Sequence, residues 1–230
     1  MDTTPTETET HPYHHYLFFN VQPEFYRLPA PGQTKLKHEF KNQLEGLNDI
    51  LITPYATLGL KGGTTFMLWC RSPRPETVTT MLPGLLRTGL GACLTLVQTY
   101  FGLVRPSQYS GRTGKPEQVI QNYAERLPYF ILYPFTKTHS WHQLAPENRR
   151  SIMGQHIKTG LSHPDIRQCL LYSYGLDDQE FLVSYETSTL EEFQDLVIEM
   201  RALIGRPYTL SDTPIYTCLY KPLSELVDWL

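Results

Sequence analysis

The feature that most constrains this chain is a pattern of strands and helices that occurs twice. In the first half, apolar and β-branched runs predict strands at 16–22, 50–60, 64–70 and 95–104, with helices at 35–47 and 76–89. The second half repeats this order, with strands at 129–135, 166–174, 180–186 and 213–220 and helices at 146–159 and 190–204. Each half is a β-α-β-β-α-β unit, in which helices cover one face of an antiparallel sheet. The sequence therefore predicts an α+β protein of two ferredoxin-like halves with antiparallel sheets and outer helices.

The same pattern sets the domain boundaries that we expect. Residues 1–12 are polar and lack apolar periodicity, so we expect a disordered tail. Residues 13–105 form the N-terminal half and residues 127–230 the C-terminal half. Residues 106–126 between them begin with a run rich in Gly, Pro and Ser, which is typical of a linker.

Composition excludes several classes of protein. The 230 residues include 20 Lys and Arg against 23 Asp and Glu, a formal charge of −3, which argues against nucleic acid as a partner. No run approaches 18 apolar residues, so we expect no membrane-spanning helix, and the acidic, polar start is not a secretory signal. Four well-separated cysteines contain no CxxC motif, and their apolar surroundings predict buried free thiols in a reducing compartment, the cytoplasm.

The segment 129–160 carries the residues with chemical potential. Tyr133 and Lys137 are four apart in a predicted strand, so an extended chain places both on one face, about 13 Å apart. His156 lies on the predicted helix between Ile152 and Gly160, on a stripe that faces inward. An inward histidine is compatible with a hydrogen-bonded core residue, a metal or haem ligand, or a general base.

Two other groups of residues have alternative interpretations. Gln168 shares a strand face with Leu170, Tyr172 and Tyr174, whereas Arg167 points to the opposite face, and a one-residue shift in register would exchange the two. Gln168 and Tyr133 taken alone are compatible with simple core packing. A second group, His11, His14 and His15, is compatible with a metal site or with solvated side chains.

Four motifs together resemble the chlorite dismutase-like haem proteins, and specifically their coproheme decarboxylase subgroup (haem synthases of the coproporphyrin-dependent pathway). The motifs are Tyr-Pro-Phe-Thr-Lys at 133–137, Trp-His-Gln-Leu-x-Pro-Glu-x-Arg-Arg at 141–150, Met-x-x-His-x-x-x-Gly at 153–160 and Gly-Leu-Asp-Asp-x-Glu-Phe at 175–181. The detailed resemblance covers about residues 129–220, and the first half matches by element order alone.

The resemblance implies a dimeric α+β barrel assembled as a homopentamer, with haem and its iron bound in the C-terminal half. By motif match His156 is the proximal iron ligand, and its second nitrogen should donate to a carbonyl or an acid. Gln168 occupies the distal position, where chlorite dismutases have an arginine. Trp141 and Arg206 are further cofactor-binding candidates at the haem edge.

The activity that the resemblance implies is the peroxide-dependent decarboxylation of two coproheme propionates to give haem b. Hydrogen peroxide oxidises the iron, Tyr133 becomes a radical that takes a hydrogen from the propionate, and carbon dioxide leaves. Lys137 would pair with a propionate. The residues 203–208 lack the acid that chlorite dismutases place behind the proximal histidine, which favours the decarboxylase. A chlorite dismutase, a haem peroxidase and a non-catalytic haem-binding protein are the alternatives.

Overall fold

The computed structural model describes residues 11–106 and 119–230. Residues 1–10 of the predicted tail and 107–118 of the predicted linker lie outside the described residues. The contacts divide the chain into two compact units, and the chain passes between them twice. The first unit contains the described residues up to Phe101 together with Cys218–Leu230, and the second contains Gly102–Thr217.

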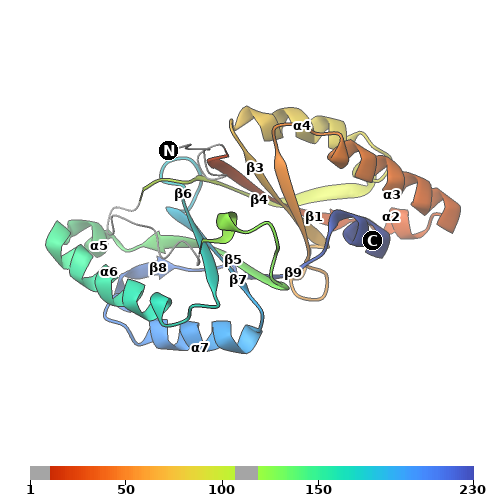
Figure 1. The fold of residues 1–230 in the computed structure, drawn as a ribbon. Coiled ribbons are helices and arrows are strands. Elements are labelled where there is room, and N and C mark those ends of the chain that lie inside the picture. The colour runs from red at the N-terminus through yellow and green to blue at the C-terminus, as the bar shows by residue number, and fades with distance from the viewer. Residues whose placement is uncertain (1–10, 107–118) are drawn as a thin grey trace, which may run out of the picture. The chain divides into compact units, whose positions relative to one another are not determined.

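The first unit is an antiparallel sheet with helices packed on one face (Figure 1). Its strands are β1 (Tyr13–Val21), β2 (Leu51–Ala56), β3 (Phe66–Ser72) and β4 (Leu94–Leu103), in the order β4-β1-β3-β2. The helices α3 (Ala30–Glu45) and α4 (Glu76–Leu86) bury apolar side chains against the sheet, among them Phe40, Leu44, Met81 and Leu85. This face is the main core of the unit.

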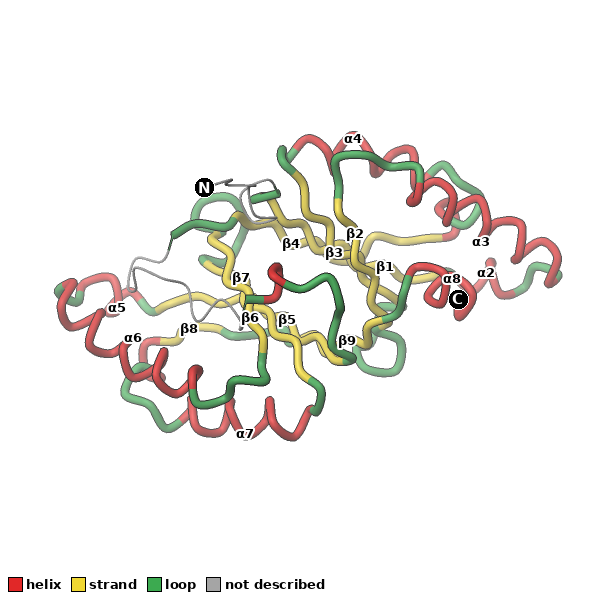
Figure 2. Tube along the Cα trace, in the orientation of Figure 1, coloured by secondary structure: helices red, strands yellow, loops and turns green. Residues whose placement is uncertain are grey.

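The second unit repeats this architecture. Its strands are β5 (Tyr129–Lys137), β6 (Arg167–Tyr172), β7 (Phe181–Thr187) and β8 (Thr209–Ser211), in the order β6-β7-β5-β8, and its long helices are α6 (Pro146–Leu161) and α7 (Leu190–Arg201). In both units the first strand along the chain pairs with the third strand, and the second strand pairs with the other edge of the third. Figure 2 shows the strands and helices of each unit. The α+β class and the duplicated ferredoxin-like fold are confirmed.

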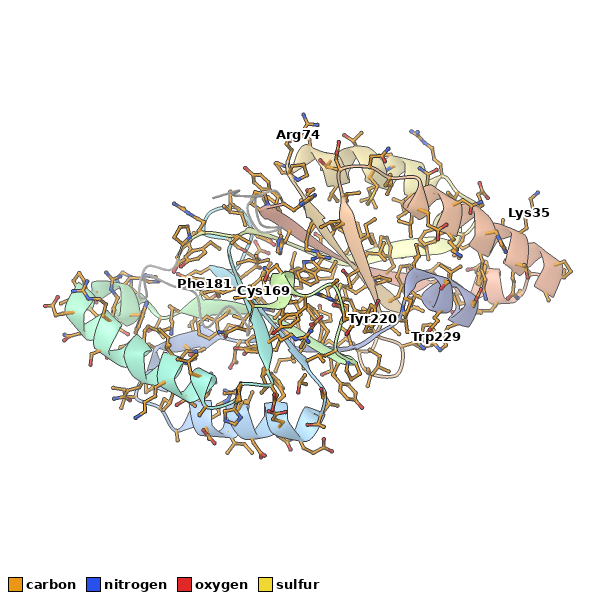
Figure 3. The ribbon with its side chains drawn as sticks, viewed as in Figure 1. Lys35, Arg74, Cys169, Phe181, Tyr220 and Trp229 are labelled. Atoms are coloured by element: carbon orange, nitrogen blue, oxygen red, sulfur yellow. The ribbon has the colours of Figure 1, made fainter. Side chains whose placement is uncertain are left out.

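Several short elements were not predicted, and two predicted elements are shorter than expected. The additional helices are α2 (Pro23–Tyr26), α5 (His139–Gln143) and α8 (Leu223–Trp229), each too short to show a periodic apolar pattern. The predicted strand at 213–220 is observed only as β9 (Tyr216–Tyr220). Its Tyr220, labelled in Figure 3, pairs with Tyr55 of β2. The α4 helix continues through Pro83 and ends at Leu86, before the predicted end at residue 89.

The two hairpins depend on glycines with positive φ. Gly63 lies in the connection between β2 and β3 with φ of 80°, and Gly175 lies in the connection between β6 and β7 with φ of 67°. Other L-residues rarely adopt this backbone region, so glycine is the residue that each turn requires. The second hairpin fixes the register of the two strands that carry Gln168 and Tyr185.

The four cysteines are free, as predicted. Cys70, Cys169 and Cys218 are buried and Cys93 is partly buried, so the expectation of burial is met fully by three of them. Burial raises the pKa of the Cys70 thiol to about 12, which keeps it protonated and unreactive. Within the described ranges, no helix combines the length and apolarity needed to cross a membrane.

Candidate functional site

A cavity of about 360 Å³ lies in the second unit, lined by side chains from β5, β7, α6, α7 and the segment that follows α7. Much of its wall is apolar, including Ile131, Phe135, Ile152, Met153, Phe193 and Val197. Its polar side chains include Tyr133, Lys137, His156, Tyr185, Arg201, Arg206 and Asp212. A mostly apolar hollow with a few convergent polar groups is typical of a small-molecule site.

Strand alternation brings Tyr133 and Lys137 into this cavity. Ile131, Tyr133, Phe135 and Lys137 are alternate residues of β5 and all line the cavity, whereas Leu132 is fully buried on the other face of the sheet. The phenol and the ammonium therefore share one wall, as the spacing predicts.

Aromatic rings and one carboxylate fix the position of Lys137. Its backbone N–H donates a hydrogen bond of 2.8 Å to Glu180, and its Nζ lies 4.9 Å from the ring centroid of Phe135 and 4.3 Å from that of Trp141. Burial lowers the pKa of Lys137 to about 8, with Arg206 acting in the same direction and the Glu180 carboxylate opposing it. The ammonium is still charged at pH 7.

Trp141 lies beside the cavity, next to Lys137. Thr138 caps the helix α5, and its hydroxyl accepts a hydrogen bond of 3.4 Å from the backbone N–H of Trp141. The indole is fully buried, with its centroid 5.6 Å from that of Tyr208. Trp141 is not one of the described residues that line the cavity, and it contacts Lys137 instead.

His156 projects from α6 into the cavity. Although α6 buries no residue completely, Ile152 and Met153 of this helix line the cavity with His156. The imidazole keeps much of its surface accessible because the space in front of it is the cavity itself. Burial by the surrounding protein, with a smaller effect of the Lys137 charge, lowers the pKa of His156 to about 4, so the ring is neutral at pH 7.

The second nitrogen of His156 has no hydrogen-bond partner among the described residues. The carbonyl or acid expected behind this imidazole is therefore not found in this part of the chain. Gly160, one turn further along, lies near α7, and a Cβ there would be in ordinary van der Waals contact with Cε of Met200, at 3.8 Å.

The register of β6 places Gln168 and Arg167 on opposite faces. Gln168 pairs with Tyr185 and so shares its face with a residue that lines the cavity, although Gln168 is not one of the described lining residues. Arg167 pairs with Glu186 on the other face, with Nη1 to Oε2 at 3.4 Å, and stacks on Tyr123 at 3.6 Å. Arg167 therefore points away from the cavity.

A carboxylate and two arginines form a charged cluster at the cavity wall. Arg206 donates to Asp212 at a distance of 2.6 Å, and Arg201 lies 3.0 Å from the same oxygen. Sequence reasoning selected Arg206 but missed Arg201 and Asp212. Arg201 ends α7 and Asp212 follows β8, a strand of only three residues, so no periodic pattern marks either position.

Tyr185 is the other residue that sequence reasoning missed. Its hydroxyl lies 3.5 Å from that of Tyr133, and the two rings are stacked with centroids 6.0 Å apart. Burial is the main cause that raises the pKa of both phenols, so both are protonated at neutral pH. The alternation 181, 183, 185 in the predicted strand was the signal that could have placed Tyr185 on this face.

Tyr172 and Tyr174, both expected on the strand face of Gln168, differ in burial because β6 ends at Tyr172 and Tyr174 lies in the turn that follows. Tyr172 is 6% exposed and Tyr174 is 42% exposed, and both rings pack edge-on against Phe181, which is labelled in Figure 3. They also line a second hollow of about 280 Å³ together with His142 and Arg149. Tyr172 is a core residue, whereas Tyr174 lies at the surface.

The N-terminal histidines do not form a metal site within the described chain. His14 is fully buried and its Nδ1 accepts a hydrogen bond of 3.3 Å from the indole of Trp69. His15 points to the other face and stacks on Phe101 at 4.5 Å. Over residues 11–106 and 119–230, no three His, Cys, Asp or Glu side chains are grouped to hold a metal ion.

Comparison with known proteins identifies the family. A curated relative, the coproheme decarboxylase of Mycolicibacterium smegmatis, is 26% identical over 179 residues, covering 77% of this chain and 76% of the relative. Two solved variants of the chlorite dismutase from Candidatus Nitrospira defluvii superpose with TM-scores of 0.88 and 0.89 at 23% and 24% identity. The first match covers 96% of both chains, and the second covers 100% of this chain and 99% of the other. Residues 33–221 match the family described as chlorite dismutase, and the chain therefore belongs to the chlorite dismutase family.

Proposed function

We propose that this protein is an oxidoreductase that decarboxylates two propionates of coproheme to give haem b, with hydrogen peroxide as the oxidant. The observation that carries the proposal is the convergence of Tyr133, Lys137 and His156 on one cavity. These are a phenol that can lose a hydrogen atom, a cation that can hold a carboxylate and a neutral imidazole that can bind iron. The resemblance of the chain to a coproheme decarboxylase supports the same substrate.

The chemistry of the cavity wall fits an iron porphyrin with carboxylate arms. The apolar side chains suit the macrocycle, and the neutral His156 presents a nitrogen that no described residue occupies. Lys137, Arg201 and Arg206 contribute three positive charges, and Asp212 offsets one of them. The net positive wall favours a ligand with several carboxylates.

Each residue has a definite task in this proposal. Bound coproheme supplies the iron at which hydrogen peroxide is reduced. His156 holds the iron, and Lys137 holds a propionate against the wall that also carries the Tyr133 hydroxyl. Tyr133 would give up its phenolic hydrogen atom to the oxidant that peroxide supplies and regain one from the propionate arm. The arm would then give a second electron to the same oxidant and lose its carboxylate as carbon dioxide, which leaves a vinyl group.

Gln168 is proposed as a neutral donor on the distal side. Its amide shares a sheet face with Tyr185, and the cationic alternative, Arg167, is held on the opposite face by Glu186. This arrangement supports peroxide chemistry over chlorite chemistry, because a neutral donor does not hold an oxyanion as a guanidinium does.

We also propose a cytoplasmic location and assembly into a homo-oligomer, a pentamer by resemblance to the family. The free thiols support a reducing compartment. Size measurement in solution by light scattering tests the pentamer directly.

The deciding experiment is incubation of the protein with ferric coproheme and hydrogen peroxide, followed by mass spectrometry of the porphyrin. Loss of two carbon dioxide units is expected. Unchanged coproheme together with oxygen release from chlorite would assign a chlorite dismutase, and unchanged coproheme with neither reaction would assign a binding protein. Tyr133→Phe should bind coproheme and give no product, whereas Tyr129→Phe, on the same strand outside the cavity wall, should remain active.

A further inference from the structure

The hydroxyl of Tyr133 is paired with a second phenol. Tyr133 and Tyr185 come from neighbouring antiparallel strands, β5 and β7, and both side chains line the cavity. Their oxygens are 3.5 Å apart, at the outer limit of a hydrogen bond, and their rings are inclined by 26°. Both hydroxyl groups therefore belong to the same site.

The register of the strands makes this pairing specific. Tyr185 is directly opposite Ile131, and Tyr133 is directly opposite Val183, so the two tyrosines are diagonal neighbours on one face of the sheet. Diagonal neighbours are within reach of aromatic side chains. The Tyr185 ring also packs on Phe193 of α7, with ring centroids 5.1 Å apart, and this contact limits the movement of the ring.

We propose that Tyr185 is a redox partner of Tyr133, and that the two phenols share the oxidising equivalent by exchange of a hydrogen atom. The inference rests on the proposed function, in which reduction of peroxide at the bound iron leaves Tyr133 as a radical. A phenoxyl oxygen only accepts hydrogen bonds, so the Tyr185 hydroxyl turns to donate to it. The O–H bond of Tyr185 then breaks and the O–H bond of Tyr133 forms. One electron and one proton move together, Tyr133 is reduced, Tyr185 is oxidised, and no further reactant is consumed.

The geometry favours transfer of the oxidising equivalent between Tyr133 and Tyr185 over its loss to residues outside the cavity. The reacting oxygens are already at the separation of a near-attack arrangement. The Tyr185 hydroxyl is protonated at neutral pH, so it holds the hydrogen atom that the Tyr133 radical takes. Exchange keeps the oxidising equivalent inside the cavity while a propionate is positioned.

The test is freeze-quench electron paramagnetic resonance of the coproheme-loaded protein after mixing with peroxide. Four variants are compared with the wild type: Tyr133→Phe, Tyr185→Phe, the double variant and Tyr129→Phe. Phenylalanine retains the ring packing, and circular dichroism checks the fold. Tyr185→Phe should lose one component of the wild-type spectrum and keep the other. Tyr133→Phe should lose both components, as the double variant does, because Tyr185 is oxidised only through Tyr133. Tyr129→Phe should match the wild type.

The inference is overturned if Tyr185→Phe matches the wild type, or if Tyr133→Phe keeps a Tyr185 signal that the double variant loses, because Tyr185 would then be oxidised without Tyr133. Its failure can be told from failure of the proposed function. If Tyr133→Phe still decarboxylates coproheme, the proposed function has the wrong redox residue. If Tyr133→Phe forms no product but Tyr185→Phe gives the wild-type spectrum, only the role of Tyr185 is wrong.

Discussion

The backbone N–H of Lys137 donates a hydrogen bond of 2.8 Å to Oε2 of Glu180, so that a carboxylate outside the cavity wall holds the end of the strand that carries the cavity's lysine. The other oxygen of Glu180 lies 2.7 Å from Nε2 of His142 in α5. Glu180 therefore connects β5, α5 and the start of β7, and its charge also supports the charged form of Lys137.

Glu180→Gln should weaken binding of a porphyrin tetracarboxylate. The variant keeps a hydrogen-bond acceptor but removes the charge that raises the pKa of Lys137, so the lysine is less protonated near pH 8. A loss of about 1.4 kcal/mol, or tenfold in Kd, is the order of effect expected. Titration with fluorescent iron-free coproporphyrin measures it. Glu199→Gln, in which a carboxylate beside His163 is neutralised, is the matched control, and an equal loss there would contradict the role of Glu180.

Binding of coproporphyrin should depend on pH through Lys137. Its pKa is about 8 in the free protein, lowered mainly by burial, and a bound carboxylate raises it again. Affinity should therefore be constant below pH 8 and fall as the pH rises above 8, where binding requires uptake of a proton. Porphyrin carboxylates ionise well below this range. In Lys137→Met the affinity should be weaker at pH 7 and flat from pH 7 to 10, and a slope that survives in this variant would assign the effect to another group.

The site shows which features a sequence can predict. The positions of Tyr133, Lys137 and His156 follow from local periodicity, because alternation in a strand and the 3.6-residue repeat of a helix decide which face each side chain occupies. Tyr185 was missed because its contact with Tyr133 depends on the register between β5 and β7, which no single segment encodes. From the sequence Trp141 was expected at the haem edge, whereas in the structure it is the buried residue of α5. The helix is too short for a periodic pattern to mark its buried side.

His156→Ala should remove the axial imidazole. In the wild type loaded with ferric coproheme we expect the absorption and resonance Raman signature of histidine-ligated iron, because the imidazole is neutral at pH 7. The variant should lose this signature and regain it when free imidazole is added. His163→Ala is the control, since His163 lies 3.4 Å from Glu199 and does not line the cavity among the described residues. An unchanged spectrum in His156→Ala would assign the iron to another ligand.

Asp212→Asn should tighten binding of the tetracarboxylate. Asp212 holds Arg206 at 2.6 Å and Arg201 at 3.0 Å, and it competes for both with the carboxylates of a ligand. Its neutralisation adds one positive charge to the wall, for a gain of up to about tenfold in affinity that high salt should reduce. The comparison is Asp195→Asn on α7, a carboxylate that is not among the described lining residues. Weaker binding by Asp212→Asn would mean that Asp212 orients the arginines more than it competes for them.

Glu186→Ala should destabilise the second unit strongly. The side chain of Glu186 is fully buried, with Oε1 3.5 Å from Arg126 and Oε2 3.4 Å from Arg167, so its removal leaves two guanidinium groups without their common carboxylate. Breaking a buried ion pair in this way costs roughly 3–5 kcal/mol of unfolding free energy. Urea denaturation followed by circular dichroism measures the loss, with the exposed Glu191→Ala as a control of small effect. Because Arg167 precedes Gln168 on β6, the same variant should also weaken coproporphyrin binding at urea concentrations where it is still folded. Unaltered stability would show that the two arginines do not depend on Glu186.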